Sequence, residues 1–441
     1  MFSIPTPAFP IPLNGIFCKV DIANMVSLPI RLLALLFGVV LSCFGCSVGP
    51  RSLLRSRLPY NDAVKSTSEQ QLLLNIVRLR YIDSPSSLSI SSIADQQEVV
   101  AGLHAIPFFT SAGAGNIGSY RGSILPQAEL SGANRPTLSY TPMDDEEFTR
   151  RLFTPISLEG VAYLSKTTWH ISTVFRLYLE NLNWVSNAET ASGPTPESSP
   201  VYEAFLEGIL ALQQLQDSKL ITLFNEERIE TVAGPFKTDE DATKNALESI
   251  QNGLELKSSE DGIRLMRRKV QPVMRVDPRA VGDPDWLLFC KGFKLNPFMQ
   301  TFDLTTEKLD PYLKDAPRNG LESLDLETRS LLQVLFFVSQ GVDVPQEHLR
   351  CGIAPQTKGY QGEMFNWQQV MGGLFHVRSV KSKKRPSCAQ VAVQYKDHWF
   401  YLDERDQDTK ATFALLLEVS RLELGSTKSQ APLLTLPLGG R

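Results

Sequence analysis

The spacing of apolar residues predicts a chain that uses both helices and strands. Between Asn61 and Tyr81, leucine, isoleucine and valine recur every three or four residues, which places them on one face of a helix. Polar and apolar residues alternate over 86–93, and β-forming residues fill 135–142, as expected for half-buried strands. No regular alternation of single strands with single helices follows, and no internal repeat is present. The pattern therefore predicts an α+β fold of mixed helices and short antiparallel strands.

Helices and strands are expected to continue to residue 424. Helical spacing or composition marks six later segments, residues 143–153, 158–185, 201–217, 239–256, 326–341 and 406–424. Residues 388–402 predict a hairpin, because β-forming residues alternate on both sides of Lys396-Asp397. Strand-forming residues also fill 219–224 and 263–276, and we expect two strands in the second of these segments.

A stretch rich in proline and serine, SNAETASGPTPESSP at 186–200, interrupts this pattern. It has few residues that could be buried, so it is either an interdomain linker or a long insertion. We therefore expect two α+β domains. The successive parts are a signal segment, a tether, the N-terminal domain, this stretch, the C-terminal domain and a loose tail, at residues 1–45, 46–58, 59–185, 186–200, 201–425 and 426–441.

The N-terminal segment has the order of a secretory signal. Arg31 precedes an apolar run from Leu32 to Leu41, and small residues follow. A glycine stands directly before Cys46, which resembles the lipobox of bacterial lipoproteins. The resemblance implies that Cys46 is lipidated and begins the mature chain, with Cys43 as the second candidate.

The location of the protein depends on how this segment is processed. Translation from Met25 would give the signal an ordinary length. The alternative is an uncleaved helical anchor, because the uncharged stretch from Arg31 to Arg51 approaches the roughly 20 residues that span a bilayer. Ser47 stands where an aspartate would resemble an inner-membrane retention signal, so we expect the periplasmic face of the outer membrane. An uncleaved helix would instead hold the protein in the inner membrane.

Composition limits the kinds of partner that we expect for this chain. The net charge is −4, whereas a nucleic-acid-binding surface needs a clustered excess of lysine and arginine, so we expect no nucleic acid. No later apolar run reaches the length of a membrane span. The expected partners are therefore the membrane, through the N-terminal anchor, and an envelope protein. Cys290, Cys351 and Cys388 could supply one disulfide, or all three could be buried thiols.

Two motif-like stretches fail the tests for their chemistry. GAGNIG at 113–118 matches G-x-G-x-x-G, but no helix pattern or correctly spaced acid follows, so we expect a loop at the tip of a long hairpin. FVSQG at 337–341 lacks the first glycine of G-x-S-x-G and lies in a predicted helix, whose C-terminal cap we expect at Gly341. The sequence therefore indicates no catalytic residue.

Metal ligands are equally sparse. No two histidines are three or four residues apart, and His348 with Cys351 would need two further ligands to bind zinc. The acids of DERDQD at 403–408 lack the central glycine of a calcium loop. Asp406 or Asp408 as an N-cap explains them more simply, because an apolar helical period follows. We expect no metal and no cofactor.

The segment RSVKSKKRP concentrates positive charge. It is expected to be a mobile surface turn, because a proline and a strand follow it. If it binds a partner, that partner is anionic, and lipid headgroups or lipopolysaccharide are within reach from the envelope. The candidate interaction residues are Lys381, Lys383, Lys384 and Arg385.

Four blocks of sequence resemble an uncharacterised family of bacterial lipoproteins. They include LLLNIVRLRYIDSP and YKDHWFYLDERDQD, and they lie at residues 72–85, 136–156, 328–348 and 395–416. Since the blocks are spread over most of the mature chain, the resemblance is full-length. It implies a lipid-anchored envelope protein, and it implies no activity, ligand or catalytic residue.

The sequence as a whole favours a non-enzymatic interaction or assembly component that faces the periplasm. An anchor, a large body and the lack of a recognisable catalytic motif support this hypothesis. The alternative is an envelope hydrolase or ligand-binding protein whose site is assembled from distant residues. A deep polar pocket with titratable groups would favour the alternative, and an open sheet edge would favour partner binding.

Overall fold

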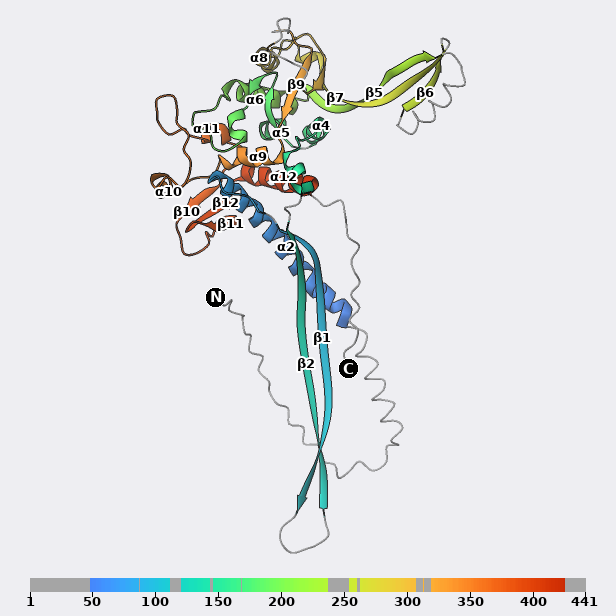
Figure 1. Cartoon of the computed structure of the whole chain (residues 1–441), viewed down its shortest axis with the longest axis vertical. Coiled ribbons are helices and arrows are strands. Elements are labelled where there is room, and N and C mark those ends of the chain that lie inside the picture. Colours follow the sequence, from blue (N-terminus) through green and yellow to red (C-terminus); the bar gives the residue numbers. More distant parts are fainter. Residues whose placement is uncertain are drawn as a thin grey trace. The chain divides into compact units, whose positions relative to one another are not determined.

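Figure 1 shows the computed structural model of the chain. The structure describes residues 48–86, 88–111, 120–142, 146–167, 169–236, 254–259, 262–306, 312 and 319–424. Cys43, Cys46, the glycine-rich stretch 113–118 and the tail 426–441 lie outside these ranges. Close contacts divide the chain into two units, residues 1–65 and 66–441. Among the described helices, none has the length and apolar character needed to cross a membrane.

Helices and strands are mixed along the described chain, which confirms the predicted α+β fold. The helices are α2 (Val48–Arg80), α3 (Glu146–Phe153), α4 (Leu158–Lys166), α5 (Ile171–Tyr178), α6 (Glu203–Asp217), α8 (Pro284–Gly292), α9 (Leu331–Ser339), α10 (Gln346–Arg350), α11 (Gln368–Met371) and α12 (Gln407–Leu424). Short 3₁₀ turns are η2 (Glu189–Ser192) and η3 (Pro278–Ala280).

The strands form three sheets. They are β1 (Leu88–Ser111), β2 (Tyr120–Pro142), β3 (Leu179–Leu182), β4 (Val185–Ser186), β5 (Ile221–Phe236), β6 (Leu254–Ser259), β7 (Gly262–Val276), β8 (Thr301–Thr305), β9 (Ser323–Thr328), β10 (Arg378–Val380), β11 (Ala389–Tyr395) and β12 (His398–Asp403). The seven-stranded sheet has the order β4-β3-β9-β8-β7-β5, with β6 also paired to β7. Only the β8–β9 pair is parallel among the described ladders. The other sheets are β10-β12-β11 and the hairpin β1-β2.

An aromatic cluster lies where α6 packs against α8. Trp286, Phe289 and Phe293 of this region are fully buried, and Phe205 meets Phe293 edge to face. Burial of each such side chain contributes about 1.5–3 kcal/mol relative to exposure. Gly208 of α6 makes the close approach feasible, because a Cβ there would lie 2.5 Å from the Phe293 ring.

The single helix predicted over 158–185 was wrong. α4 ends at Lys166, its C-cap Thr167 donates a hydroxyl hydrogen bond to the Leu164 carbonyl, and α5 starts only at Ile171. The chain then enters β3, because residues 179–182 pair with β9. A tight turn to β4 follows, with Asn183 and Trp184 at positive φ. Pairing with a distant strand therefore overrode the local helical spacing.

The segment 186–200 is not an interdomain linker. Residues 66–441 form one unit by their contacts, and β3 of the expected N-terminal domain lies within the large sheet. The Asn187 side-chain amide donates to the carbonyls of Arg176 and Leu179, and Ala191 and Ser192 of η2 are buried. The small residues of this segment are therefore packed inside the fold, where proline and serine content suggested exposure.

The apolar helix over 326–341 is confirmed in its second half. Residues up to Thr328 belong to β9, and α9 begins after Ser330, whose side chain forms a capping box with Gln333. α9 is buried on several sides, as its composition predicted. Gly341 follows the C-cap Gln340, and a Cβ there would lie 2.5 Å from the Phe375 carbonyl oxygen. Close approach of backbone therefore requires this glycine.

The segment 263–276 forms one strand, β7, where two were expected. Pro272 removes a donor from the middle of this strand. The side-chain amide of Gln271 donates to the Leu304 carbonyl of β8 and so supplies a donor there. Of the helix expected over 239–256, residues 237–253 lie outside the described ranges, and 254–256 belong to strand β6.

Other expectations can be compared directly with the structure. Residues 48–58, expected as a tether, are the first part of α2. The hairpin of β11 and β12 is confirmed, with Lys396 and Asp397 at φ 45° and 63° in its turn. The N-cap at Asp406 is confirmed, because its carboxylate accepts from the backbone N–H and the hydroxyl of Thr409.

Candidate functional site

Two histidines fifty residues apart in sequence meet near the end of α2. We call Tyr81, Glu347, His348 and His398 the histidine cluster. Tyr81 directly follows α2, Glu347 and His348 lie in α10, and His398 begins β12. The tight turn at Lys396-Asp397 determines where β12 begins, and it therefore places His398 at the first position of that strand. Tyr81, His348 and His398 are buried, whereas Glu347 is half exposed.

Hydrogen bonds, one ring contact and close charged contacts link these side chains. The Tyr81 hydroxyl lies 2.7 Å from His348 Nδ1. The His398 ring lies edge-on to the His348 ring, with centroids 4.7 Å apart, and its Nε2 lies 3.0 Å from Glu347 Oε1. Lys381 Nζ donates to both oxygens of the same carboxylate at 3.0 and 3.1 Å. The network therefore connects the buried phenol to a surface ion pair.

The surroundings shift the pKa values of three members of the cluster. Burial, and then the neighbouring His398, lower the pKa of His348. The ammonium of Lys381 lowers the pKa of Glu347 by donating a hydrogen bond to it. Burial raises the pKa of Tyr81. His348 is therefore held in the neutral form, in which one ring nitrogen can accept a hydrogen bond.

These residues have some of the properties of a metal site. Ligand atoms of Glu347, His348 and His398 lie within 4.8 Å of one another, and two imidazoles with a carboxylate suit transition metals. The Lys381 ammonium already balances the carboxylate, however, and Tyr81 already occupies His348 Nδ1. A divalent cation would have to displace Lys381 from the carboxylate, whereas the second ring nitrogen of His348 is not used by Tyr81. Cys351, the other expected partner of His348, is exposed and is not part of this group.

The four candidate interaction residues have different surroundings. Lys381 belongs to the network of the histidine cluster. Lys383 and Lys384 are exposed. Arg385 donates to the carbonyls of Ala389 and Gln390 at the start of β11, at 3.1 and 2.9 Å. The basic segment therefore contributes to two different surfaces, which its sequence did not indicate.

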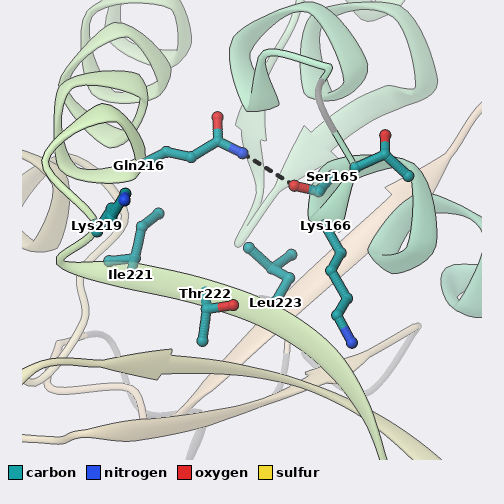
Figure 2. Close-up of a pocket in the computed structure, with 8 residues that line it drawn as sticks. Ser165, Lys166, Gln216, Lys219, Ile221, Thr222 and Leu223 are labelled. Carbon is teal, nitrogen blue, oxygen red and sulfur yellow. Dashed lines mark hydrogen bonds between the residues drawn. The ribbon is translucent and has the colours of Figure 1, made fainter.

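A hollow of about 300 Å³ lies between the ends of α4 and α6 and the start of β5. Figure 2 shows Gln216 reaching from α6 toward Ser165 of α4, whose carbonyl accepts a hydrogen bond from its amide at 2.9 Å. Lys166 and Lys219 also line this hollow. Its described lining includes no carboxylate, imidazole or thiol, so it has no acid–base pair for hydrolysis.

The other candidate nucleophiles are a serine that is hydrogen-bonded within its own helix and three free cysteines. The hydroxyl of Ser339 is directed back to the Phe336 carbonyl within α9. Cys290, Cys351 and Cys388 are free thiols, and burial raises the pKa of Cys290 to about 12, which keeps it protonated. Among the described residues, Glu347, His348 and His398 are the one group of three His, Cys, Asp or Glu side chains whose ligand atoms lie close together. Sequence reasoning missed it because its histidines come together only through the fold.

Comparison with known proteins adds no relative: no protein-family model matches the chain, and no curated protein or solved structure shows significant similarity to it.

Proposed function

We propose that this chain is an envelope-anchored lipoprotein that acts as a non-enzymatic assembly component and faces the periplasm. In this proposal Cys46 carries the lipid, and the outer membrane is the location favoured by Ser47. The body binds a protein partner through open strand edges. Resemblance of the N-terminal segment to a lipobox supports the anchor, and the β1–β2 hairpin supports the assembly role.

The hairpin is the observation that carries the proposal. β1 and β2 pair from Leu88 opposite Pro142 to Ser111 opposite Tyr120, with one register shift between Ile90 and Ser92. At about 3.3 Å per residue, each strand is roughly 80 Å long. Neither strand pairs with any other described strand, so both outer edges present unpaired N–H and C=O groups. A two-stranded hairpin is marginally stable in water, and a partner strand on either edge would stabilise it.

A second open edge has the same character. β5 is the last strand of the seven-stranded sheet, and its far half pairs with β7 alone among the described strands. Ile229 and Val232 on β5 and Val270 on β7 are exposed there. Native sheets normally cover or charge such edges, and β5 carries Glu227 and Glu230 beside Ile229. The exposed apolar side chains, and not a lack of charge, therefore favour protein contact here.

The alternative function is a ligand-binding protein or hydrolase that uses the histidine cluster. Its support is the lowered pKa of His348 and the contact of that ring with a buried phenol. Neither of the two described hollows is lined by a cluster histidine, however. The open edges of the hairpin are the stronger observation, and we favour the assembly role.

Cross-linking tests the proposal. Wild-type chain, Cys46→Ser and a shortened hairpin would be affinity-purified from gently solubilised envelopes after brief cross-linking. In the shortened hairpin, Asn-Gly replaces residues 95–136, which leaves Ala94 opposite Thr137 in register. We expect a stoichiometric partner with the wild type, and its loss with the shortened hairpin.

The two parts of the proposal fail separately. If Cys46→Ser captures the same partner but stays in the membrane fraction, the lipid anchor is wrong and the assembly role stands. If the wild type is recovered alone at full yield, the assembly role is contradicted. An unchanged unfolding temperature for the body of the shortened variant would show that its result does not come from misfolding.

A further inference from the structure

A groove separate from the hairpin lies between α2 and the three-stranded sheet. Its volume is about 500 Å³, within the range of ligand sites. One wall is α2, with Leu74 and Arg78, and the other is formed by residues 392–394 of β11 together with Trp399 of β12. Arg385, from the basic segment, stands at the same groove. The groove therefore combines apolar side chains and the amides of Gln70, Gln71 and Gln394 with two guanidinium groups.

The floor of the groove is a buried part of the three-stranded sheet. β11 is the terminal strand in the order β10-β12-β11, but Val391, Ala392 and Val393 are buried, so the main chain of this edge is covered. Trp399 of β12 is the cross-strand partner of Gln394, and both line the groove. Arg385 occupies the carbonyls of Ala389 and Gln390. A ligand in this groove therefore has to bind through side chains and not through main-chain pairing with β11.

The charge of the groove specifies the chemistry of that ligand. Arg78 donates to Ser86 Oγ and Asn75 Oδ1, both neutral, and Arg385 donates to main-chain carbonyls. Neither guanidinium forms an ion pair with a described carboxylate, whereas Arg150, Arg228 and Arg405 each do. Guanidinium groups bind carboxylates bidentately, with two parallel hydrogen bonds. Two such groups at one groove therefore favour an acidic segment.

We propose that this groove binds an acidic peptide segment of a protein partner. Its apolar side chains lie against Leu74 and Trp399, and its carboxylate binds Arg78 and Arg385. The inference goes beyond the proposed function, because it uses neither the hairpin nor the anchor.

A peptide selection tests the proposal on the full-length chain in detergent. A displayed library of random heptapeptides would be selected on the wild type, with removal of binders to the double variant Arg78→Gln, Arg385→Gln. We expect enriched peptides to carry aspartate or glutamate. Their affinity should fall about tenfold or more when that acid is replaced by its amide, or on the double variant, since charged hydrogen bonds contribute about 1.5–3 kcal/mol.

Two control variants show whether peptide binding is specific to the groove. Arg421→Gln removes an exposed arginine of α12 and should leave peptide affinity unchanged. The shortened hairpin should also bind the peptides, so failure of the hairpin proposal would not affect this result. No enrichment, enrichment of peptides without acids, or equal binding to the double variant would overturn the inference. Co-sedimentation with phosphatidylglycerol vesicles that depends on both arginines, without peptide binding, would replace the peptide by a lipid surface and also overturn it.

Discussion

Replacement of Arg329 by methionine should destabilise the protein by about 3–5 kcal/mol. The Arg329 side chain is fully buried, and burial lowers its pKa to about 9. Its guanidinium donates to Ser192 Oγ, to the Asn187 carbonyl and to the carbonyls of Arg176 and Leu177 in the last turn of α5. It therefore caps a helix end and fastens segment 186–200 to it.

The magnitude follows from the acceptors that the substitution leaves behind. Methionine has similar length and can still lie on the Phe337 ring, which the guanidinium now covers at 4.0 Å. It cannot donate, so the Leu177 and Asn187 carbonyls lose this donor, whereas the Arg176 carbonyl still accepts from the Asn187 amide. Each unpaired buried group costs about 1–3 kcal/mol, and the lost charged hydrogen bonds account for the remainder.

Urea unfolding followed by circular dichroism measures this effect, with Arg421→Met as the matched control. Arg421 is half exposed and pairs with Glu418 one helical turn away, so its loss should cost about 0.5 kcal/mol or less. Arg329→Met should also make segment 186–200 readily cleaved by proteases. If the two variants were equally stable and equally resistant, segment 186–200 would not be held as described.

Three further perturbations test local features of the structure. Since the folded state lowers the pKa of His348, the unfolded state binds a proton more readily than the folded state. The free energy of unfolding should therefore decrease as the pH falls below about 6.5, by at most about 1.4 kcal/mol per pH unit. In urea titrations, His348→Gln should make this pH dependence smaller. Gly341→Ala places a Cβ 2.5 Å from a backbone oxygen and should cost about 1–3 kcal/mol, whereas Gly193→Ala meets nothing within 4 Å and should unfold at the wild-type temperature. Asp397→Gly relieves a φ of 63° in the β11–β12 turn and should raise the free energy of unfolding by up to about 1 kcal/mol; a loss would contradict the turn geometry.

Local sequence signals predicted the elements that local forces determine. The β11–β12 hairpin, the N-cap at Asp406 and the apolar helix α9 each follow from residues within one or two turns of chain. The stretches 86–93 and 135–142 likewise predicted strands, and they pair as parts of β1 and β2. Here periodicity and capping chemistry agree with the final packing, so the sequence alone was sufficient.

Elements that depend on distant partners were not predictable in this way. Residues 179–182 became strand β3 because β9, far along the chain, offers an edge for them. Segment 186–200 looked exposed because no local signal shows that the buried guanidinium of Arg329 would bind its carbonyl and hydroxyl oxygens. The histidine cluster was missed for the same reason, since α10 and β12 meet only in the folded unit.

Hydrogen exchange of the β1–β2 hairpin tests the central claim most directly. Exchange would be measured by mass spectrometry on the chain in intact envelopes and on the purified chain, with peptides from the β11–β12 hairpin as an internal reference. Because open edges leave outward N–H groups unpaired, the account predicts fast exchange in the purified chain and marked protection in the envelope. Equally fast exchange in both samples would mean that no partner pairs with the hairpin, and would contradict the assembly role.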